Sequence, residues 1–504
     1  MSTHLVDPQA GSHPSPPIVA LPATRAQADP SGTCLVDDAR SVDNATFAAD
    51  VDMLALRMAA LGLTPGDVVA VLLPNRCEIV TTMFAAWSQA AALTPVNPAL
   101  TDDEVRYQLR DSNSRVLVGD ERSARLAAEL EIAYIDVETI HRRGEHAGKM
   151  AFAAAESPAV GKHDHALIVY TSGTTGRPKG CVLDHGNVHA MVESIVEVLA
   201  FGPRDRSLLV LPLFHCNGLL VGVLSVLLAG GSVVVGPRFS PEAFWDAVER
   251  HRPTFFSAVP TMYALLHAGT ERPVDVSSLR FGICGAAPMS ADLLVRFEKR
   301  FGFPLVEGYG LSECSVAATI NPVAGPRKPG TVGPALPGQV VAIEDHDGRR
   351  LPLGQSGEVV IKGPNVMRGY LGRPEDTAKV LKDGWLHTGD VGYLDEDGYL
   401  VLVDRIKDMI IRGGENIYPK EIENVLFELE DVLEAAVVGH ADEIFGEVPV
   451  AYVVPRPGRA LDPEALRMHC SDRLARYKVP REFHVLADLP KNSVGKIVKR
   501  DLRG

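Results

Sequence analysis

Residues 166–180 of this chain of 504 residues read ALIVYTSGTTGRPKG, an apolar run followed by a glycine-rich loop. Residues 166–170 form a short apolar run, which predicts a buried strand. Residues 171–180 hold three glycines, which let the backbone approach a phosphate chain, and their hydroxyl groups, Arg177 and Lys179 supply donors. No Gly-Lys-Ser/Thr ends the loop, so it is not a Walker A loop, and a hydroxyl-rich turn without function is the alternative. We therefore expect a phosphate-binding loop directly after a strand.

The surrounding sequence predicts an α/β fold. Short apolar runs at residues 68–73, 208–211 and 255–259 alternate with helical patterns, which is typical of parallel sheets covered by helices. Between about residues 330 and 393 the pattern changes to short strands separated by Gly and Pro turns, which indicates a distorted antiparallel β-subdomain.

A further unit begins at Asp404. It is predicted to hold a helix at 419–429, strands at 432–438 and 450–454, a helix at 462–474 and a basic tail. The chain is thus divided into an N-terminal arm (1–32), extended or frayed because of its Pro and Ser content, a large domain (33–403) and a small, mobile α+β domain (404–504). A site between two such unequal domains suits a large substrate.

Composition excludes several classes of function. The formal net charge of −14 gives no support for a nucleic-acid partner. The seven scattered cysteines show no CxxC or CxxH spacing, so free thiols in a reducing cytoplasm fit better than a zinc site or disulfides. Residues 1–32 lack the pattern of a signal peptide, and the uncharged run 218–236 is interpreted as a buried helix and strand split by Gly230 and Gly231, not as a membrane span.

Five later motifs occur in the order and spacing that one protein family shows. They are EGYGLSE (307–313), LHTGD (386–390), DRIKDMI (404–410), GGENIYP (413–419) and PKNSVGKI (490–497). With the loop at 171–180, they resemble the adenylate-forming superfamily of acyl-CoA synthetases, peptide-synthetase adenylation domains and firefly luciferase. The resemblance extends from about residue 35 to the end of the chain, and acyl-CoA synthetases match best.

The resemblance implies a set of residues that bind ATP or AMP. Tyr309, flanked by two glycines, would lay its ring against adenine, Asp390 would accept the ribose hydroxyls with the help of Arg405, and residues 285–288 would border the base. The full set is Thr171, Ser172, Gly173, Thr174, Thr175, Gly176, Lys179, Gly285, Ala286, Ala287, Pro288, Glu307, Gly308, Tyr309, Gly310, Ser312, Asp390 and Arg405. The alternatives are a core tyrosine, surface ion pairs and simple turns.

Catalysis is implied for Lys496, Glu313 and His215. Lys496 would contact both the carboxylate and the α-phosphate, and Glu313 would hold Mg²⁺ near the phosphates. No general base is needed, because the attacking carboxylate is already ionised near neutral pH. A solvated basic tail is the alternative for Lys496, and a surface ion pair for Glu313.

Thiol transfer is implied by a second set of positions. Asp404 matches the family's hinge, about which the small domain rotates, and Gly413 and Gly414 match the glycines beside the pantetheine tunnel. The alternatives are a charged residue at the end of a strand and a tight turn. The resemblance thus implies ATP, Mg²⁺ and coenzyme A as cofactors or co-substrates.

The acyl pocket is expected around six residues: His215, Val259, Thr261, Gly285, Gly308 and Val316. The segment after residue 214 offers no aspartate for an amine, and Gly308 stands where malonate-activating relatives have arginine. An amino acid and malonate are therefore disfavoured, and a fatty, aryl or alicyclic acid is expected.

The predicted activity is that of an ATP-dependent acid–thiol ligase, which converts a carboxylic acid first to an acyl-adenylate and then to a thioester of coenzyme A. The alternatives are an acyl-AMP ligase that loads a carrier-protein phosphopantetheine, an enzyme that runs only one half-reaction, a luciferase-like oxygenase, and a silent binding protein. A homodimer is compatible with the sequence. No transmembrane segment is expected.

Overall fold

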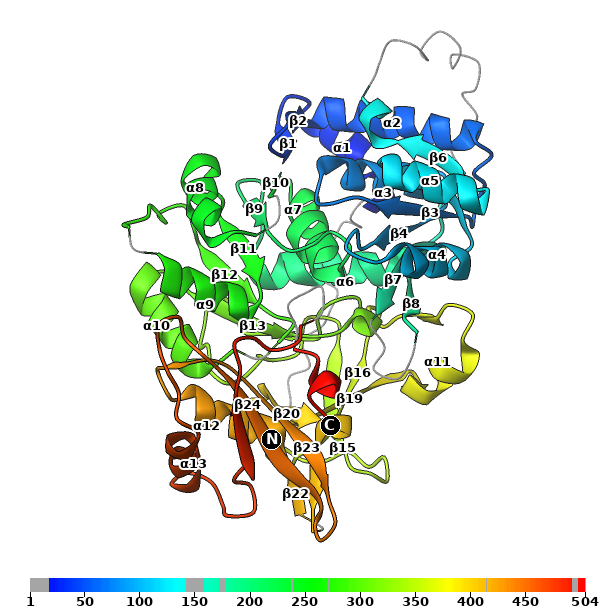
Figure 1. The fold of residues 1–504 in the computed structure, drawn as a ribbon. Helices are drawn as coiled ribbons and strands as arrows, with labels where there is room; N and C mark the ends of the chain where they lie inside the picture. The colour runs from blue at the N-terminus through cyan, green and yellow to red at the C-terminus, as the bar shows by residue number, and fades with distance from the viewer. Residues whose placement is uncertain are drawn as a thin grey trace, which may run out of the picture.

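The computed structural model describes residues 18–141, 158–171, 177–236, 239–270, 272–287, 289–413, 415–491 and 497–503. These residues form four β-sheets packed with helices, so the expected α/β fold is confirmed. Two sheets that contain parallel strands occupy the upper part of the view in Figure 1, and the orange C-terminal elements lie below them.

Strands β7 and β8, which flank the predicted phosphate loop, belong to a seven-stranded sheet of order β17-β8-β7-β4-β3-β5-β6. Its strands β3 to β7 run parallel, whereas β8 and β17 are antiparallel additions at one edge. The strands are β3 (Val68–Leu72), β4 (Ala92–Val96), β5 (Ser114–Gly119), β6 (Ala133–Asp136), β7 (His165–Thr171), β8 (Lys179–Asp184) and β17 (Gly369–Tyr370). Helices α3 (Cys77–Ser88), α4 (Asp102–Asp111) and α5 (Glu121–Leu130) pack with this sheet. Helix α2 (Asn44–Ala60) packs against α3, and the 3₁₀ turn η2 (Val137–Thr139) follows β6.

The second sheet has eight strands in the order β14-β13-β12-β11-β9-β10-β1-β2, of which all but the two edge strands are parallel. The strands are β1 (Thr33–Val36), β2 (Ser41–Asp43), β9 (Arg206–Leu209), β10 (Ser232–Val235), β11 (Phe255–Ala258), β12 (Phe281–Cys284), β13 (Leu305–Tyr309) and β14 (Thr319–Ile320). The helices between them are α6 (His185–Leu199), η3 (Asn217–Leu224, π-helical), α7 (Ser225–Leu228), α8 (Pro241–His251), α9 (Pro260–Gly269) and α10 (Ala291–Phe301). Because the carboxyl ends of parallel strands share one edge, the segments after β9, β11 and β12 meet there.

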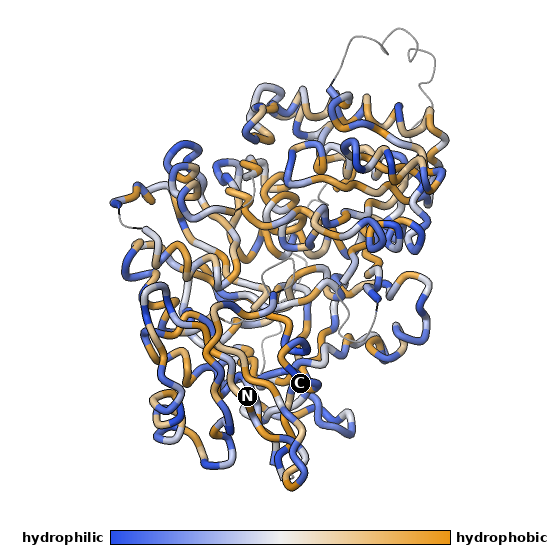
Figure 2. The backbone as a smooth tube through the Cα atoms, viewed as in Figure 1, coloured by the Kyte–Doolittle hydropathy of each residue, from blue (hydrophilic) through white to orange (hydrophobic). Residues whose placement is uncertain are grey.

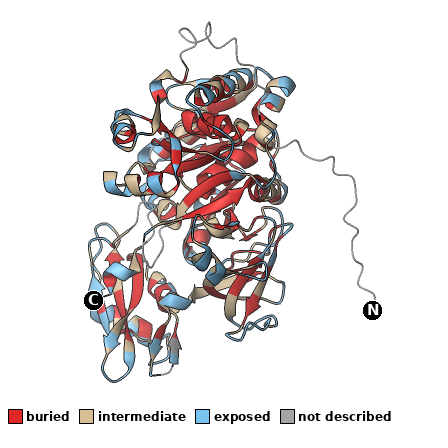
Figure 3. Cartoon of the chain, turned by 90° about the vertical axis from the view of Figure 1, so that its right-hand side faces the viewer, coloured by how far each residue is buried: buried red, intermediate tan, exposed pale blue. Residues whose placement is uncertain are grey.

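The core is made by apolar strands buried on both faces. Every residue of β3 and β4 is buried, as a parallel sheet between helices requires. Figure 2 shows the hydrophobic colour concentrated in these inner segments, and Figure 3 shows the central strands as buried. Trp87 is fully buried and donates its indole N–H to the carbonyl of Ala166 at 2.8 Å, which ties α3 to the strand that leads into the phosphate loop.

The last two sheets are mostly antiparallel. The first holds β15 (Val340–Glu344), β16 (Gly357–Lys362), β18 (Leu381–Lys382), β19 (Trp385–Leu394) and β20 (Leu400–Arg405), with helix α11 (Pro374–Val380) beside it. The second holds β21 (Ile410–Arg412), β22 (Glu415–Ile417), β23 (Val432–Asp442), β24 (Gly446–Pro455) and β25 (Glu482–Val485), with helices α12 (Pro419–Phe427) and α13 (Pro463–Ser471). Short 3₁₀ turns are η4 (Ser312–Cys314), η5 (Ile406–Asp408) and η6 (Lys499–Leu502). Strand β20 continues past residue 403, so the expected hinge residue Asp404 lies inside a strand.

The expected N-terminal arm is wrong from Ile18 onward. Ile18–Ala20 form the 3₁₀ turn η1 and Leu21–Ala28 form α1, with Ile18, Leu21 and Arg25 buried. Arg25 donates hydrogen bonds to the carbonyls of Leu227 and Gly231 at 2.7 and 2.8 Å, which dock the helix on the core. Proline in the first turn of α1 does not oppose a helix, because the N–H groups of that turn have no helical partner.

The uncharged run at 218–236 has the predicted structure. It contains most of η3, then α7, and finally strand β10. Within the described ranges, no helix is both long and apolar enough to cross a bilayer. All seven cysteines are buried and free.

Candidate active site

The phosphate loop connects two paired strands. Thr171 ends β7 and Lys179 begins β8, and the two residues are partners in the antiparallel register. Ser172, Gly173, Thr174, Thr175 and Gly176, which were also predicted to bind ATP, lie outside the described residues. The ammonium of Lys179 pairs with Asp376 at 2.9 Å and lies 5.1 Å from the ring centre of Tyr370.

A small polar cluster holds Arg177 and Pro178, the residues of this loop that precede β8. The guanidinium of Arg177 lies 5.3 Å from the ring centre of Tyr107, whose hydroxyl donates to the carbonyl of Pro178 at 2.8 Å. Arg373 donates in turn to the Tyr107 hydroxyl at 2.8 Å and to Asp111 at 3.0 Å. Helix α4 and the segment before α11 thus hold one side of the loop.

Glu313 lies beside the same group of side chains. The hydroxyl of Tyr370 donates to its Oε1 atom at 2.7 Å, and Met367 N–H donates to its main-chain carbonyl at 2.8 Å. No group of three or more His, Cys, Asp and Glu side chains in the described ranges could hold a metal ion by itself. A lone carboxylate near a phosphate loop suits Mg²⁺, which is usually held by one or two carboxylates together with substrate phosphates and water.

The predicted ribose site is a connected trio. Asp390 accepts from the Tyr309 hydroxyl at 2.7 Å and pairs with Arg405 Nε at 2.8 Å. Burial and the nearby Asp390 carboxylate raise the pKa of Tyr309, so its hydroxyl stays protonated and donates. Arg405 lies opposite Asp390 in the β19–β20 register, which explains how it reaches this carboxylate. At Gly310, a Cβ atom would lie 2.3 Å from the carbonyl oxygen of Val316, so the backbone here admits no side chain.

The loop predicted to border adenine follows β12. Ala286 has a φ of +66°, a left-handed conformation that costs a non-glycine residue about 1–3 kcal/mol. Pro288 lies outside the described residues. Glu307 on the neighbouring strand accepts from the Met289 N–H at 3.3 Å, and burial raises the pKa of its carboxyl to about 7. Ser312, at the start of η4, accepts a hydrogen bond from the Cys181 thiol through its carbonyl at 3.3 Å.

Gly285 and Gly308, two of the predicted acyl residues, lie together where β12 and β13 end. A Cβ atom on Gly285 would lie 3.6 Å from the carbonyl oxygen of Gly308 and 3.8 Å from Nδ2 of Asn217, so these three residues face one another. Burial lowers the pKa of His215 to about 4, which makes the ring neutral at pH 7. Within the described part of the chain, His215 Nε2 and Asn217 Oδ1 are buried and have no hydrogen-bond partner.

The other three predicted acyl residues lie at the start of α9 and near Gly310. Val259 directly precedes α9, and Thr261 lies in the first turn of that helix. Val316 approaches Gly310 through its main chain, and its side chain packs against the large hydrophobic core.

The predicted hinge and thiol positions lie around α12 and β21. Asp404 accepts from the N–H of Lys420 at 2.8 Å, which caps the start of α12, and burial raises the pKa of its carboxyl. Gly413 has a φ of +59° and donates its N–H to the Phe445 carbonyl at 2.8 Å. Gly414 and Lys496 lie outside the described residues.

Sequence reasoning missed the residues that surround Lys179 and Glu313. Tyr370, Arg373 and Asp376 come from one stretch, MRGYLGRPEDT (367–377), to which no role was assigned. A tyrosine after a glycine, followed by a proline-started helix, is a local signal for a fixed turn but does not reveal contacts with residue 313. Asn217, in the segment after residue 214, was also assigned no role.

The fold, with Tyr309, Asp390 and Arg405 brought together and Glu313 near Lys179, is that of an adenylate-forming enzyme. Residues 23–371 match the model of the AMP-binding enzyme family, and residues 421–496 match that of the AMP-binding enzyme C-terminal domain. The chain belongs to the AMP-binding enzyme family.

Curated relatives cover nearly the whole chain. A feruloyl-CoA synthase from Amycolatopsis sp. is 39% identical over 486 residues, covering 96% of this chain and 97% of that protein. An indoleacetate–CoA ligase from Aromatoleum aromaticum is 38% identical and covers 94% of this chain and 95% of its own length.

Solved structures of CoA ligases have the same fold. The ATP-bound MatB from Rhodopseudomonas palustris has a TM-score of 0.89 at 33% identity, covering 96% of this chain and 98% of that one. An o-succinylbenzoate CoA synthetase from Bacillus subtilis, with its acyl-adenylate bound, has a TM-score of 0.85 at 34% identity and the same coverage. The predicted enzyme class, an AMP-forming acid–thiol ligase, is confirmed.

Proposed function

We propose that this enzyme joins an aryl monocarboxylic acid, with no second charged group, to coenzyme A through an acyl-adenylate. In the first step, a carboxylate oxygen of the acid attacks the α-phosphorus of ATP, and pyrophosphate leaves with the electron pair of the broken bond. In the second step, the thiol sulfur of coenzyme A attacks the acyl carbonyl, its proton passes to solvent, and AMP leaves. Mg²⁺, when bound, would neutralise phosphate charge.

The site residues have separate tasks in the first step. Lys179 and the phosphate loop would bind the phosphates, Asp390 with Tyr309 and Arg405 would bind the ribose, and Glu313 would bind the metal. Lys496 would stabilise the charge that accumulates where carboxylate and α-phosphate meet. The 2.7 Å bond between Tyr309 and Asp390 and the 2.8 Å pair between Asp390 and Arg405 support the ribose assignment, because they fix the carboxylate before the nucleotide arrives.

The acid class follows from the polarity of the acyl segment. His215 is neutral, and its Nε2 atom and Asn217 Oδ1 are buried without partners. A second carboxylate would be buried here without a cation, which costs several kcal/mol, whereas a hydroxyl group would satisfy these atoms. Gly285 follows β12 and Gly308 lies on the neighbouring β13, and neither residue has a side chain that would block a flat ring from the backbone. The identity of 39% to a feruloyl-CoA synthase supports the same class.

A pyrophosphate-release screen tests this proposal. We expect ferulate to be activated with at least about a hundredfold higher kcat/KM than 2-succinylbenzoate or another dicarboxylate. The variant Asn217→Leu should reduce the preference for ferulate over cinnamate, which lacks the ring hydroxyl, by roughly tenfold. A dicarboxylate as best substrate would refute the acid class, and an unchanged preference would refute the role of Asn217.

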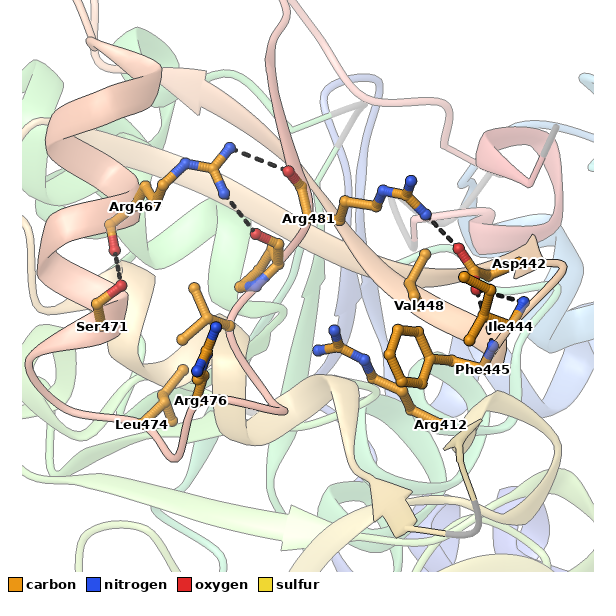
Figure 4. A pocket seen from close by; sticks show the side chains of 12 residues that line it. Arg412, Asp442, Ile444, Phe445, Val448, Arg467, Ser471, Leu474, Arg476 and Arg481 are labelled. Carbon is orange, nitrogen blue, oxygen red and sulfur yellow. Dashed lines mark hydrogen bonds and ion pairs between the residues drawn. The ribbon is translucent and has the colours of Figure 1, made fainter.

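We also propose that the acceptor thiol is free coenzyme A. Arg412, the neighbour of Gly413, is one of the residues that line a groove with a cavity volume of about 530 Å³ (Figure 4). Four arginines line it, Arg412, Arg467, Arg476 and Arg481, and the Arg412 guanidinium lies 4.9 Å from the ring centre of Phe445. Guanidinium groups bind phosphates well, and a nucleotide with several phosphates would fit this surface. A cytoplasmic location is also predicted, in keeping with the seven free thiols. A homodimer stays a prediction as well.

Removing one phosphate from the acceptor tests the groove. We expect dephospho-coenzyme A to show a KM at least about tenfold higher than coenzyme A, because charge-assisted hydrogen bonds to the phosphate are lost. The variant Arg476→Ala should raise the KM for coenzyme A but not the KM for dephospho-coenzyme A. Equal KM values for both acceptors in the unmodified enzyme, or better transfer to a carrier-protein phosphopantetheine, would contradict this part of the proposal.

A further inference from the structure

We infer that Tyr370 is a positioning residue that holds Glu313 ready for a metal ion and keeps it apart from Lys179. The inference rests on the proposed function, since it assumes that Glu313 receives Mg²⁺ together with ATP. It concerns the short strand β17, which the sequence left without a role.

The position of Tyr370 is fixed by its neighbours on the backbone. Strand β17 pairs with β8, with Tyr370 opposite Cys181, so Tyr370 lies on the strand next to the one that begins with Lys179. The N–H of Tyr370 donates to the Thr377 hydroxyl at 2.9 Å, and the N–H of Arg373 donates to its carbonyl at 3.1 Å. Both main-chain groups of Tyr370 are therefore hydrogen-bonded, which fixes the direction in which its side chain leaves the backbone.

The hydroxyl of Tyr370 orients one oxygen of Glu313. It donates to Oε1 at 2.7 Å, and in the described ranges Oε2 of Glu313 has no hydrogen-bond donor. A carboxylate fixed at one oxygen presents the other in a defined direction, which lowers the entropy lost when a metal ion binds.

The ring of Tyr370 has a second effect, on Lys179. The Lys179 ammonium lies 5.1 Å from the ring centre and forms its ion pair with Asp376 at 2.9 Å. A lysine paired directly with Glu313 would compete with the metal ion for the carboxylate. The ring face and Asp376 give the cation another place, so phosphate-binding and metal-binding charges stay separate before ATP arrives.

Calorimetric binding of ATP at a series of Mg²⁺ concentrations tests the inference on the full chain. For Tyr370→Phe we expect the Mg²⁺ concentration at half-maximal stabilisation of the ATP complex to rise roughly tenfold, as is common when a residue behind a metal ligand is lost. Binding of ATP with EDTA present should change less than twofold. ATP–pyrophosphate exchange by the same variant should recover toward the unmodified rate at high Mg²⁺.

The matched control is Tyr399→Phe. Tyr399 also donates its hydroxyl, to the Pro326 carbonyl at 2.8 Å, and also has a lysine ammonium near its ring, that of Lys328 at 4.7 Å. This variant should keep the normal Mg²⁺ dependence. An unchanged Mg²⁺ midpoint in Tyr370→Phe, or an equal shift in both variants, would overturn the inference. If the unmodified enzyme bound ATP with no Mg²⁺ dependence, the role of Glu313 in the proposed function would fail instead.

Discussion

Replacing Lys496 by alanine is expected to abolish adenylate formation while leaving thiol transfer intact. The first step brings an anionic carboxylate onto an anionic phosphate, and a cation at that point stabilises the charge in the transition state. Preorganised charges of this kind contribute roughly a thousandfold or more to phosphoryl-transfer rates. We therefore expect ATP–pyrophosphate exchange to fall at least about a thousandfold in Lys496→Ala, measured with the best acid from the screen. Thioester formation from synthetic acyl-adenylate and coenzyme A should stay within severalfold of normal.

The control for this variant is Arg500→Ala. Arg500 lies in the same C-terminal tail, and its side chain is 70% exposed in a surface pair with Asp501. Such a pair contributes little to stability, so this variant removes one tail charge without affecting the site. It should exchange pyrophosphate at the normal rate. Retained exchange in Lys496→Ala, or an equal loss in Arg500→Ala, would contradict the role assigned to Lys496.

The second large effect is expected for Asp390→Asn. If Asp390 accepts both ribose hydroxyls, the variant loses two hydrogen bonds to a charged acceptor, each contributing about 1.5–3 kcal/mol. We expect kcat/KM for ATP to fall at least about a hundredfold. Unmodified enzyme should lose activity with 2′-deoxy-ATP, whereas Asp390→Asn should show little further loss with it, because the interaction is already absent.

Asp395→Asn is a suitable control for this experiment. Asp395 follows the same strand β19 but pairs with Lys328 at 2.7 Å. It should leave kcat/KM for ATP within about twofold of normal, as expected for an ion pair near the surface. If Asp390→Asn retained its full discrimination against 2′-deoxy-ATP, the carboxylate would not bind the ribose.

The sequence was sufficient to single out residues that the structure brings together. The phosphate loop, the Tyr309–Gly310 pair and Asp390 are encoded by short motifs, and the structure brings Tyr309, Asp390 and Arg405 together although 81 residues separate Tyr309 from Asp390. The buried strands were also predictable, because continuous apolar runs have few other uses in a globular protein. The division of the run at Gly230 and Gly231 into helix and strand was confirmed.

The rest depended on contacts that no local pattern records. Helix α1 was missed because its stability comes from the burial of Arg25 against carbonyls more than 200 residues away. Tyr370 was missed because its contact with Glu313 spans 57 residues. The neutrality of His215 depends on its burial by distant segments. Each of these features is decided by tertiary packing and not by the local conformational preference of the residues.

The central claim is that acid activation precedes thiol transfer. It is tested most directly by following ATP–pyrophosphate exchange and AMP release in one preparation, with ferulate, before and after coenzyme A is added. We expect acid-dependent exchange without coenzyme A, and release of AMP in equal amount with the acyl thioester once coenzyme A is present. Exchange that requires coenzyme A, or release of ADP and phosphate instead of AMP and pyrophosphate, would contradict it.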